Sequence, residues 1–226
     1  YLHHGEREVH AGPRPAVLLG HVGTQVAVVA PVRTPGVEHP VDREPSTTGR
    51  RHALYGELGA LAVRGNHDER VLSWFRAERE GPPLDRPLSR GHRAVCAALG
   101  DEDVAWLEAL PLTLRLPEHR TTVVHAGLRP GVAIHRQDPV DLLNMRSLTS
   151  TGGVSYRADD GVPWASRWTG SDLVVFGHDA IRGLQRYEQA IGLDTGCVYG
   201  GQLTALLLPS RRIVSVNARR AYKEIV

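Results

Sequence analysis

The chain has 226 residues, of which 41% are hydrophobic and 23% charged, and these values are typical of a globular domain with its own core. Its formal net charge is only +2, which by itself gives no argument for binding to nucleic acid or to a membrane surface. No apolar run reaches the roughly 20 residues of a membrane span, and the N-terminus has no signal-peptide core. The two distant cysteines match no zinc or redox motif. We therefore expect a cytoplasmic protein with reduced thiols.

The expected secondary structure changes in character near residue 50. Six prolines interrupt residues 11–50, where only residues 16–19 and 26–30 are expected to form strands. Beyond residue 60, one amphipathic helix is predicted in residues 69–80, and another has Asp101 as its N-cap and ends before Pro111. Further strands are predicted at residues 61–63, 112–116, 121–124, 173–176, 191–194, 203–208 and 212–216. This pattern favours a single layered α/β domain over residues 1–226, in which residues 1–50 are atypical.

Three predicted strands end in a glycine and a side chain that can bind a metal ion. The segments are residues 63–68 (Val-Arg-Gly-Asn-His-Asp), 123–127 (Val-Val-His-Ala-Gly) and 174–179 (Val-Val-Phe-Gly-His-Asp). A strand end holds a side chain rigidly, and glycine lets the backbone turn sharply or approach a ligand. Each segment alone could be a turn or a buried histidine, but together Asn66, His125 and His178 carry donor atoms that suit a borderline divalent cation.

In this order the three segments resemble the last three motifs of the calcineurin-like metallophosphoesterases of the phosphoprotein-phosphatase type. Residues 144–148, 163–165, 176–185 and 192–206 are similar to the ApaH-like, diadenosine-tetraphosphatase branch of that family. The resemblance covers about residues 55–222. It implies an α/β fold in which a β-sandwich is flanked by α-helices in four αββα layers. It also implies two divalent cations, manganese or a similar transition metal, at the sheet edge, one of them held by the three residues named above.

The resemblance further implies roles for single residues around the metals. His67 would act as a general acid or stabilise the leaving group, and Asp42 would orient it. Arg43 would hold phosphate through its planar guanidinium group, and Arg146 is a further candidate for substrate binding. This assignment agrees with the chemistry, since phosphoryl transfer requires stabilisation of charge on the phosphate oxygens.

The first half of the family site departs from the pattern. The expected Gly-Asp-x-Val-Asp-Arg-Gly-Pro motif falls on residues 38–45, where His39 replaces the aspartate that bridges both metals and Glu44 replaces a glycine. Glu8 and His10 are the best placed candidates for the preceding Asp-x-His motif. A neutral imidazole cannot bridge two cations as a carboxylate does. Three explanations of this departure stay open. The second metal binds weakly, the protein is a one-metal or inactive relative, or residues 1–50 are an altered or misread stretch.

We expect a metal-dependent hydrolase of phosphoanhydride bonds in dinucleoside polyphosphates such as diadenosine tetraphosphate, with capped RNA 5′ ends as a further substrate. Trp164, Trp168 and Tyr199 could stack on a nucleobase or simply pack in the fold. The alternatives are a protein Ser/Thr phosphatase on the same scaffold and a catalytically impaired nucleotide-binding relative. Neither a membrane nor an obligate protein partner is expected.

Overall fold

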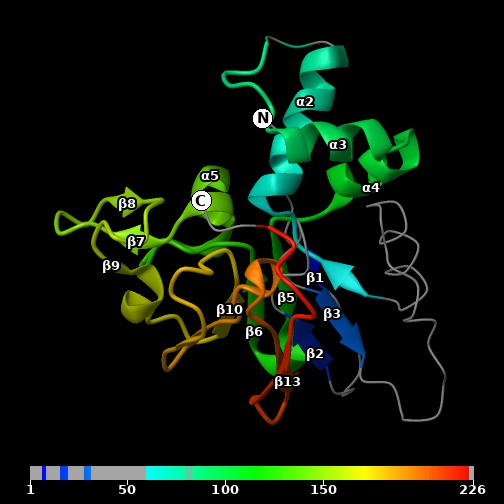
Figure 1. Ribbon diagram of the computed structural model, residues 1–226. Helices are drawn as coiled ribbons and strands as arrows, with labels where there is room; N and C mark the ends of the chain where they lie inside the picture. Colours follow the sequence, from blue (N-terminus) through cyan, green and yellow to red (C-terminus); the bar gives the residue numbers. More distant parts are fainter. Residues whose placement is uncertain are drawn as a thin grey trace.

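The computed structural model describes residues 60–79, 81 and 83–223, and before them only the backbone of residues 7–8, 16–19 and 28–31. Its helices and strands are arranged as a mixed α/β fold (Figure 1). The α-helices are α2 (Asn66–Arg79), α3 (Arg90–Ala98), α4 (Asp101–Ala109) and α5 (Pro139–Asn144). The 3-10 helices are η1 (Pro117–His119), η2 (Ile134–Arg136), η3 (Trp164–Arg167) and η4 (Cys197–Tyr199).

The strands form three sheets. The six-stranded sheet has the order β1 (Arg7–Glu8), β5 (Thr113–Leu116), β6 (Thr121–Val124), β10 (Leu173–Phe176), β12 (Ala190–Gly192) and β11 (Gln185–Arg186). The five-stranded sheet has the order β14 (Arg212–Asn217), β13 (Gln202–Leu208), β2 (Ala16–Leu19), β3 (Val28–Pro31) and β4 (Leu61–Ala62). The small sheet has the order β8 (Val154–Ser155), β7 (Ser147–Leu148) and β9 (Val162–Pro163).

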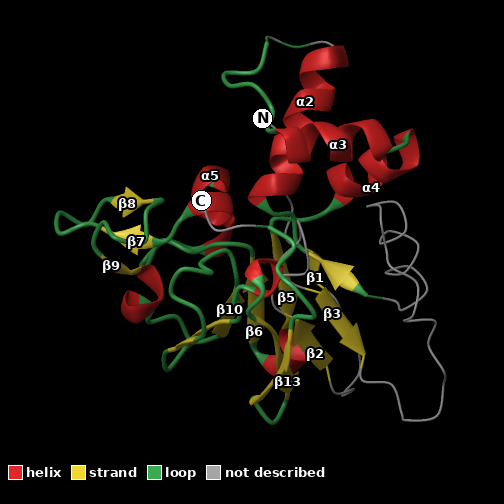
Figure 2. Cartoon of the chain, in the orientation of Figure 1, coloured by secondary structure: helices red, strands yellow, loops and turns green. Residues whose placement is uncertain are grey.

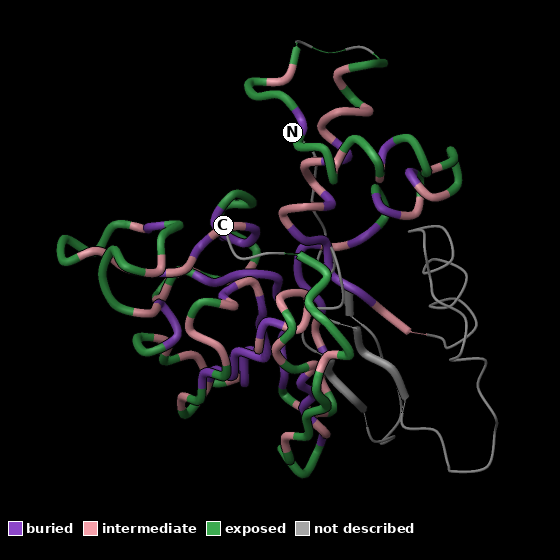
Figure 3. Tube along the Cα trace, viewed as in Figure 1, coloured by how far each residue is buried: buried purple, intermediate pink, exposed green. Residues whose placement is uncertain are grey.

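The two larger sheets pack face to face, and the alternation of side chains along β10 explains how. Leu173 and Val175 lie in a buried cluster that also contains Leu206 and Leu208 of β13 in the other sheet. Val174 and Phe176 point to the opposite face, where they pack against α5 and η3. Because successive strand residues point to opposite faces, a strand that is apolar at all four positions must be covered on both sides. Figure 3 shows this central region of the fold as buried.

The helices α2, α3 and α4 form a separate packed group beyond the end of the strands (Figure 2). Their shared core contains Leu72 of α2, Cys96 of α3 and Leu107 of α4. This arrangement places the first turn of α2, rather than its middle, next to the sheets. Within the part of the chain that the structure describes, none of the helices has the length and apolar character needed to cross a membrane.

The fold confirms the predicted β-sandwich with flanking helices and most of the predicted strands. The strands at Ala16–Leu19, Thr121–Val124 and Leu173–Phe176 have the predicted bounds. The strand predicted at residues 26–30 is displaced to Val28–Pro31. The helices α3 and α5 and the small sheet were not predicted, because each of these elements spans nine residues or fewer.

Two helix starts were predicted wrongly. Helix α2 begins at Asn66, three residues before the expected range, so the Gly-Asn-His segment forms the helix start and not a loop. Asp101 is the first residue of α4 and Gly100 is its N-cap. The carboxylate of Asp103 accepts a hydrogen bond from the Gly100 backbone N–H at 3.1 Å, which satisfies the N-terminal end of the helix from within the first turn.

Candidate metal centre

Strand direction brings two of the predicted ligands to one edge of the six-stranded sheet. The strands β6 and β10 are parallel neighbours, with Val175 paired to Val123. His125 and His178 follow the carboxyl ends of these two strands and therefore meet at the same edge. Their imidazole centroids lie 4.8 Å apart.

Three donor atoms from the three predicted segments converge at this edge. Nε2 of His125 lies 2.9 Å from Oδ1 of Asn66 and 3.1 Å from Nδ1 of His178. A divalent cation holds nitrogen and oxygen ligands at about 2.0–2.2 Å, so neighbouring donors of an octahedral ion lie about 3 Å apart. The donor atoms of Asn66, His125 and His178 therefore have the chemistry and spacing of one face of a cation site.

The trio supplies a partial set of metal ligands. The trio consists of two histidines and the amide of Asn66. Among the described residues, no group of three or more His, Cys, Asp or Glu side chains is arranged to hold a metal ion. The carboxylate side of the site was predicted in the first 50 residues. His10, His39, Asp42 and Arg43 all lie outside the described residues, and their roles stay predictions.

Glu8 is described only as a backbone position in β1. Strand β1 is parallel to β5, and β5 is antiparallel to β6. Because β6 runs toward His125, β1 runs away from that edge of the sheet. Glu8 pairs with Arg115, which lies two residues further from the edge than Thr113. The register therefore gives no support to Glu8 as a metal ligand.

The Asn66 position is held by hydrogen bonds on both sides of the β4–α2 junction. The carboxylate of Asp68 accepts from the Gly65 N–H at 2.8 Å, which stabilises the start of α2. The buried guanidinium group of Arg64 donates to the carbonyls of Glu108 at 2.6 Å and Leu110 at 3.2 Å at the end of α4. The junction is thus fastened to the helical group, and this limits the freedom of Asn66.

His125 is completely buried. Two residues later, the backbone of Gly127 lies against the ring of Trp164, which leaves no room for a side chain at this position. A Cβ atom at Gly127 would lie 2.6 Å from Nε1 of Trp164, which is closer than real side chains come. That indole N–H donates to the Ala126 carbonyl at 3.1 Å. The segment that carries His125 is therefore locked against η3.

His178 has a backbone conformation that histidine seldom adopts. Its φ is +64°, and the Asp179 N–H donates to the Gly177 carbonyl at 2.7 Å across it, which makes a tight three-residue turn. Such strain persists only where the surroundings enforce it, and it gathers at functional sites. Here the buried carboxylate of Asp179 accepts from Arg182 at 2.6 Å and from Gln185 at 3.3 Å, which holds the turn in place.

Arg146, predicted as a substrate-binding residue, lies against the His178 turn. Its guanidinium group donates to the His178 carbonyl at 3.2 Å and to the Tyr156 carbonyl at 2.7 Å. Burial lowers the pKa of Arg146 from its ordinary value, and the charge of Asp179 opposes that shift. This arrangement brings a cation next to the metal centre, although its role in binding stays a prediction.

His67 lies next to Asn66 in the first turn of α2 and contacts a residue that the sequence did not point to. Its Nδ1 lies 2.9 Å from Nε2 of His92 on α3, and Nδ1 of His92 lies 2.7 Å from the hydroxyl of Ser89. Partial burial, with smaller contributions from Arg70 and Lys223, lowers the pKa of His92. No motif marked His92, because its contact depends on the packing of α3 against α2.

The predicted nucleobase contacts are only partly compatible with the structure. Trp164 is 1% exposed and packs on Phe176 with ring centroids 4.8 Å apart, so it is a core residue and cannot stack on a nucleobase. Trp168 is half-buried against the same cluster. Tyr199 lies half-buried in η4, and its stacking on a nucleobase stays a prediction.

The packed sheets and the three donor groups at their edge define a metallophosphoesterase. The chain is 34% identical over 195 residues to bis(5′-nucleosyl)-tetraphosphatase PrpE (asymmetrical) of Geobacillus sp. (strain WCH70), a match that covers 80% of this chain and 77% of the relative. It is 32% identical to the protein of the same name from Anoxybacillus flavithermus, over 75% of this chain and 71% of the relative.

A solved structure supports the same relationship. The crystal structure of a protein assigned as a diadenosine tetraphosphatase superposes with a TM-score of 0.64 at 36% identity, and the match covers 74% of this chain and 72% of the other. No family model matches the chain. The identity and coverage shared with the curated relatives nevertheless show that the chain belongs to the bis(5′-nucleosyl)-tetraphosphatase family.

Proposed function

We propose that this chain hydrolyses a phosphoanhydride bond in dinucleoside polyphosphates such as diadenosine tetraphosphate, with a divalent cation, manganese or a similar transition metal, as cofactor. The convergence of Asn66, His125 and His178 is the observation that carries the proposal. It occurs in a chain whose relatives are named as asymmetrical tetraphosphatases. We therefore expect unequal products, AMP and ATP, from water and diadenosine tetraphosphate.

The residues of the chain have separable tasks in this reaction. A cation held by the trio would act as a Lewis acid on the phosphoryl oxygens. His67, beside Asn66, would give a proton to the departing oxygen. Arg146 would contact phosphate oxygens with its planar group of donors. Arg43 would bind phosphate. Asp42 would orient His67 only in place of the His92 contact, because His67 has two ring nitrogens and one of them must donate the proton.

Steady-state assays with added Mn²⁺ test the proposal against its enzymatic alternative. Diadenosine tetraphosphate, bis(p-nitrophenyl) phosphate and a phosphoserine peptide are offered separately, and nucleotide products are resolved by chromatography. Turnover of the dinucleotide to AMP and ATP supports the proposal, and two molecules of ADP would contradict the asymmetrical cleavage. Preference for the phosphopeptide would identify a protein phosphatase. A capped RNA tests the broader substrate range.

A catalytically impaired nucleotide-binding relative is the second candidate function. His39 and Glu44 favour it, because they replace a bridging carboxylate and a turn glycine in the matching motif. Binding of diadenosine tetraphosphate in calorimetry, without turnover at any tested divalent metal, would identify such a protein. The cytoplasmic location stays a proposal, and cell fractionation tests it.

A further inference from the structure

A pocket of about 530 Å³ lies next to the metal centre, between two loops. One loop carries the candidate ligand His178 and, three residues later, Ile181, which lines the pocket. The other loop follows β8 and contributes Tyr156. Arg146 lines the pocket and also donates to the His178 carbonyl, so the pocket and the metal centre share one side chain. A volume of this size is in the range of small-molecule sites.

The apolar part of the lining is exposed to solvent. Ile181 is 79% exposed and Tyr156 is 45% exposed, and both are among the large apolar side chains that the described fold leaves uncovered. Exposed apolar groups that line a hollow beside polar groups are typical of ligand sites. The hydroxyl of Tyr156 donates to Oδ1 of Asp141 at 3.2 Å, so the ring is tethered at its far end.

The charged part of the lining contains three guanidinium groups, two of which form short ion pairs with carboxylates. Arg157 is paired with Asp159 at 2.7 Å, and Arg182 is paired with Asp179 at 2.6 Å. Arg146 lies 3.9 Å from Asp179, and its Nη1 and Nη2 each donate one hydrogen bond to a backbone carbonyl. A guanidinium group has five N–H donors, so each of these two nitrogens keeps a second N–H, whereas Nε is buried. Arg146 is therefore the cation through which a phosphate could be contacted from this pocket.

We propose that this cavity, the nucleoside pocket, binds the base and ribose of one nucleotide of the substrate, with Tyr156 and Ile181 in contact with the base. Arg146 contacts a phosphate between the nucleoside and the metal centre. A tethered aromatic ring and an exposed aliphatic side chain suit the face of a nucleobase, whichever base it is. The inference rests on the proposed function, because it assigns a part of the same substrate.

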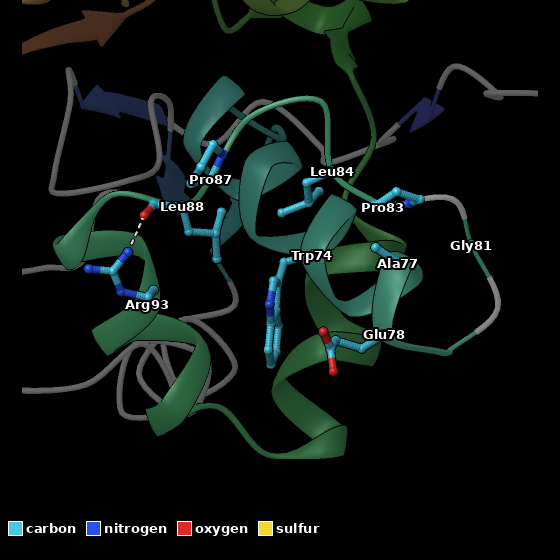
Figure 4. Close-up of a pocket in the computed structure, with 9 residues that line it drawn as sticks. All are labelled: Trp74, Ala77, Glu78, Gly81, Pro83, Leu84, Pro87, Leu88 and Arg93. Atoms are coloured by element: carbon cyan, nitrogen blue, oxygen red, sulfur yellow. Dashed lines mark hydrogen bonds between the residues drawn. The ribbon is translucent and has the colours of Figure 1, made fainter.

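A second hollow of about 510 Å³ is the competing location for a base. It lies along the carboxyl half of α2 and is lined by Trp74, Leu84, Leu88 and Arg93, among others (Figure 4). Trp74 lies eight residues beyond Asn66, which is about 12 Å along the helix axis. This hollow shares no residue with the metal centre, whereas the nucleoside pocket shares Arg146.

Comparison of a nucleotide substrate with a substrate that has no base separates the two locations. We would measure KM for diadenosine tetraphosphate and for bis(p-nitrophenyl) phosphate in Tyr156→Ala, Ile181→Ser and Trp74→Ala. The ratio of the two KM values should rise about tenfold in Tyr156→Ala, the size of one lost stacking contact, and about threefold in Ile181→Ser. Tyr156→Phe keeps the ring and should stay within about twofold of the wild type.

Val216→Ser is the matched control, because Val216 is 63% exposed on β14, in the other sheet. An unchanged KM ratio in Tyr156→Ala and Ile181→Ser, with normal thermal melting, would overturn the inference, as would a rise confined to Trp74→Ala. If the wild type turns over no dinucleotide, the proposed function fails separately. Calorimetric binding of diadenosine tetraphosphate to the same variants then decides whether the pocket binds it.

Discussion

Nδ1 of His67 lies 2.9 Å from Nε2 of His92, and the two rings are stacked with centroids 5.0 Å apart and planes 25° apart. The contact joins the first turn of α2 to α3, and the hydroxyl of Ser89 continues it on the far side of His92. A hydrogen bond to the second nitrogen of a catalytic imidazole fixes the orientation of its ring. His92 is therefore a positioning residue for the proposed general acid.

The first prediction is that His92→Ala lowers kcat on diadenosine tetraphosphate about tenfold and changes KM much less, because the effect is exerted through His67. The loss should be larger for phosphodiesters with poor leaving groups, since these depend most on protonation. A series of aryl phosphodiesters measures this dependence. His135→Ala is the control, since His135 is exposed in η2. An equal loss on all leaving groups would contradict the positioning role.

The second prediction concerns pH and the stability of the fold. The pKa of His92 is lowered from 6.5, first by burial and then by Arg70 and Lys223. The unfolded chain therefore binds this proton more readily, so the free energy of unfolding should fall as pH drops below about 6.5. We expect the wild type to lose stability relative to His92→Asn between about pH 7.5 and pH 5.5. Melting temperatures measured at each pH test this prediction. If those of the two proteins change by the same amount between about pH 7.5 and pH 5.5, the prediction is wrong.

The third prediction is that His67→Ala reduces kcat on diadenosine tetraphosphate by about 10²–10⁴-fold, the usual contribution of a general acid. KM should change little, because the proton is transferred only in the transition state. Steady-state kinetics with intact metal content measure this result. Wild-type turnover in the variant would show that another group protonates the leaving oxygen.

The fourth prediction tests the packing that holds His125. Gly127→Ala should destabilise the fold by about 1–3 kcal/mol and weaken metal binding, because the new methyl group would displace the Trp164 ring 2.6 Å away. Gly91→Ala is the matched control, since Gly91 is exposed in α3 and its Cβ would meet only the Ser89 hydroxyl at 3.9 Å. It should gain about 0.5–1 kcal/mol. Chemical unfolding compares the two, and equal stabilities would refute the packing argument.

The fifth prediction concerns the altered half of the family motif. Because His39 stands where a bridging carboxylate is expected, we predict about one tightly held metal ion per chain. Two cations about 3.5–4 Å apart repel each other strongly unless an anion lies between them. His39→Asp should then raise both metal content and turnover. Elemental analysis after gel filtration and a steady-state assay measure these quantities, and two tight metals in the wild type would show that another residue forms the bridge.

The three donor residues of the candidate metal centre could be predicted, because each of them follows a strand that is recognisable from the local sequence. The strands before His125 and His178 are buried at all four positions and rich in β-branched or apolar residues, and their glycines mark the turns that follow. Parallel strands then bring their carboxyl ends to one edge, whatever the rest of the fold does. The sequence motifs thus identified the three donor residues that the fold brings together, and the family resemblance implied the sandwich that holds them.

Other parts of the site were decided only by tertiary structure. His92 reaches His67 from 25 residues away because two helices pack together, and nothing near His92 in the chain marks that contact. The nucleoside pocket joins Tyr156 to Ile181 across two loops, and local sequence does not set the distance between loops. Trp164 shows the converse, since an aromatic residue beside the motifs became core once Gly127 and Phe176 packed against it. Which side chains face solvent and which face one another depends on the packing of distant segments, and no short pattern encodes it.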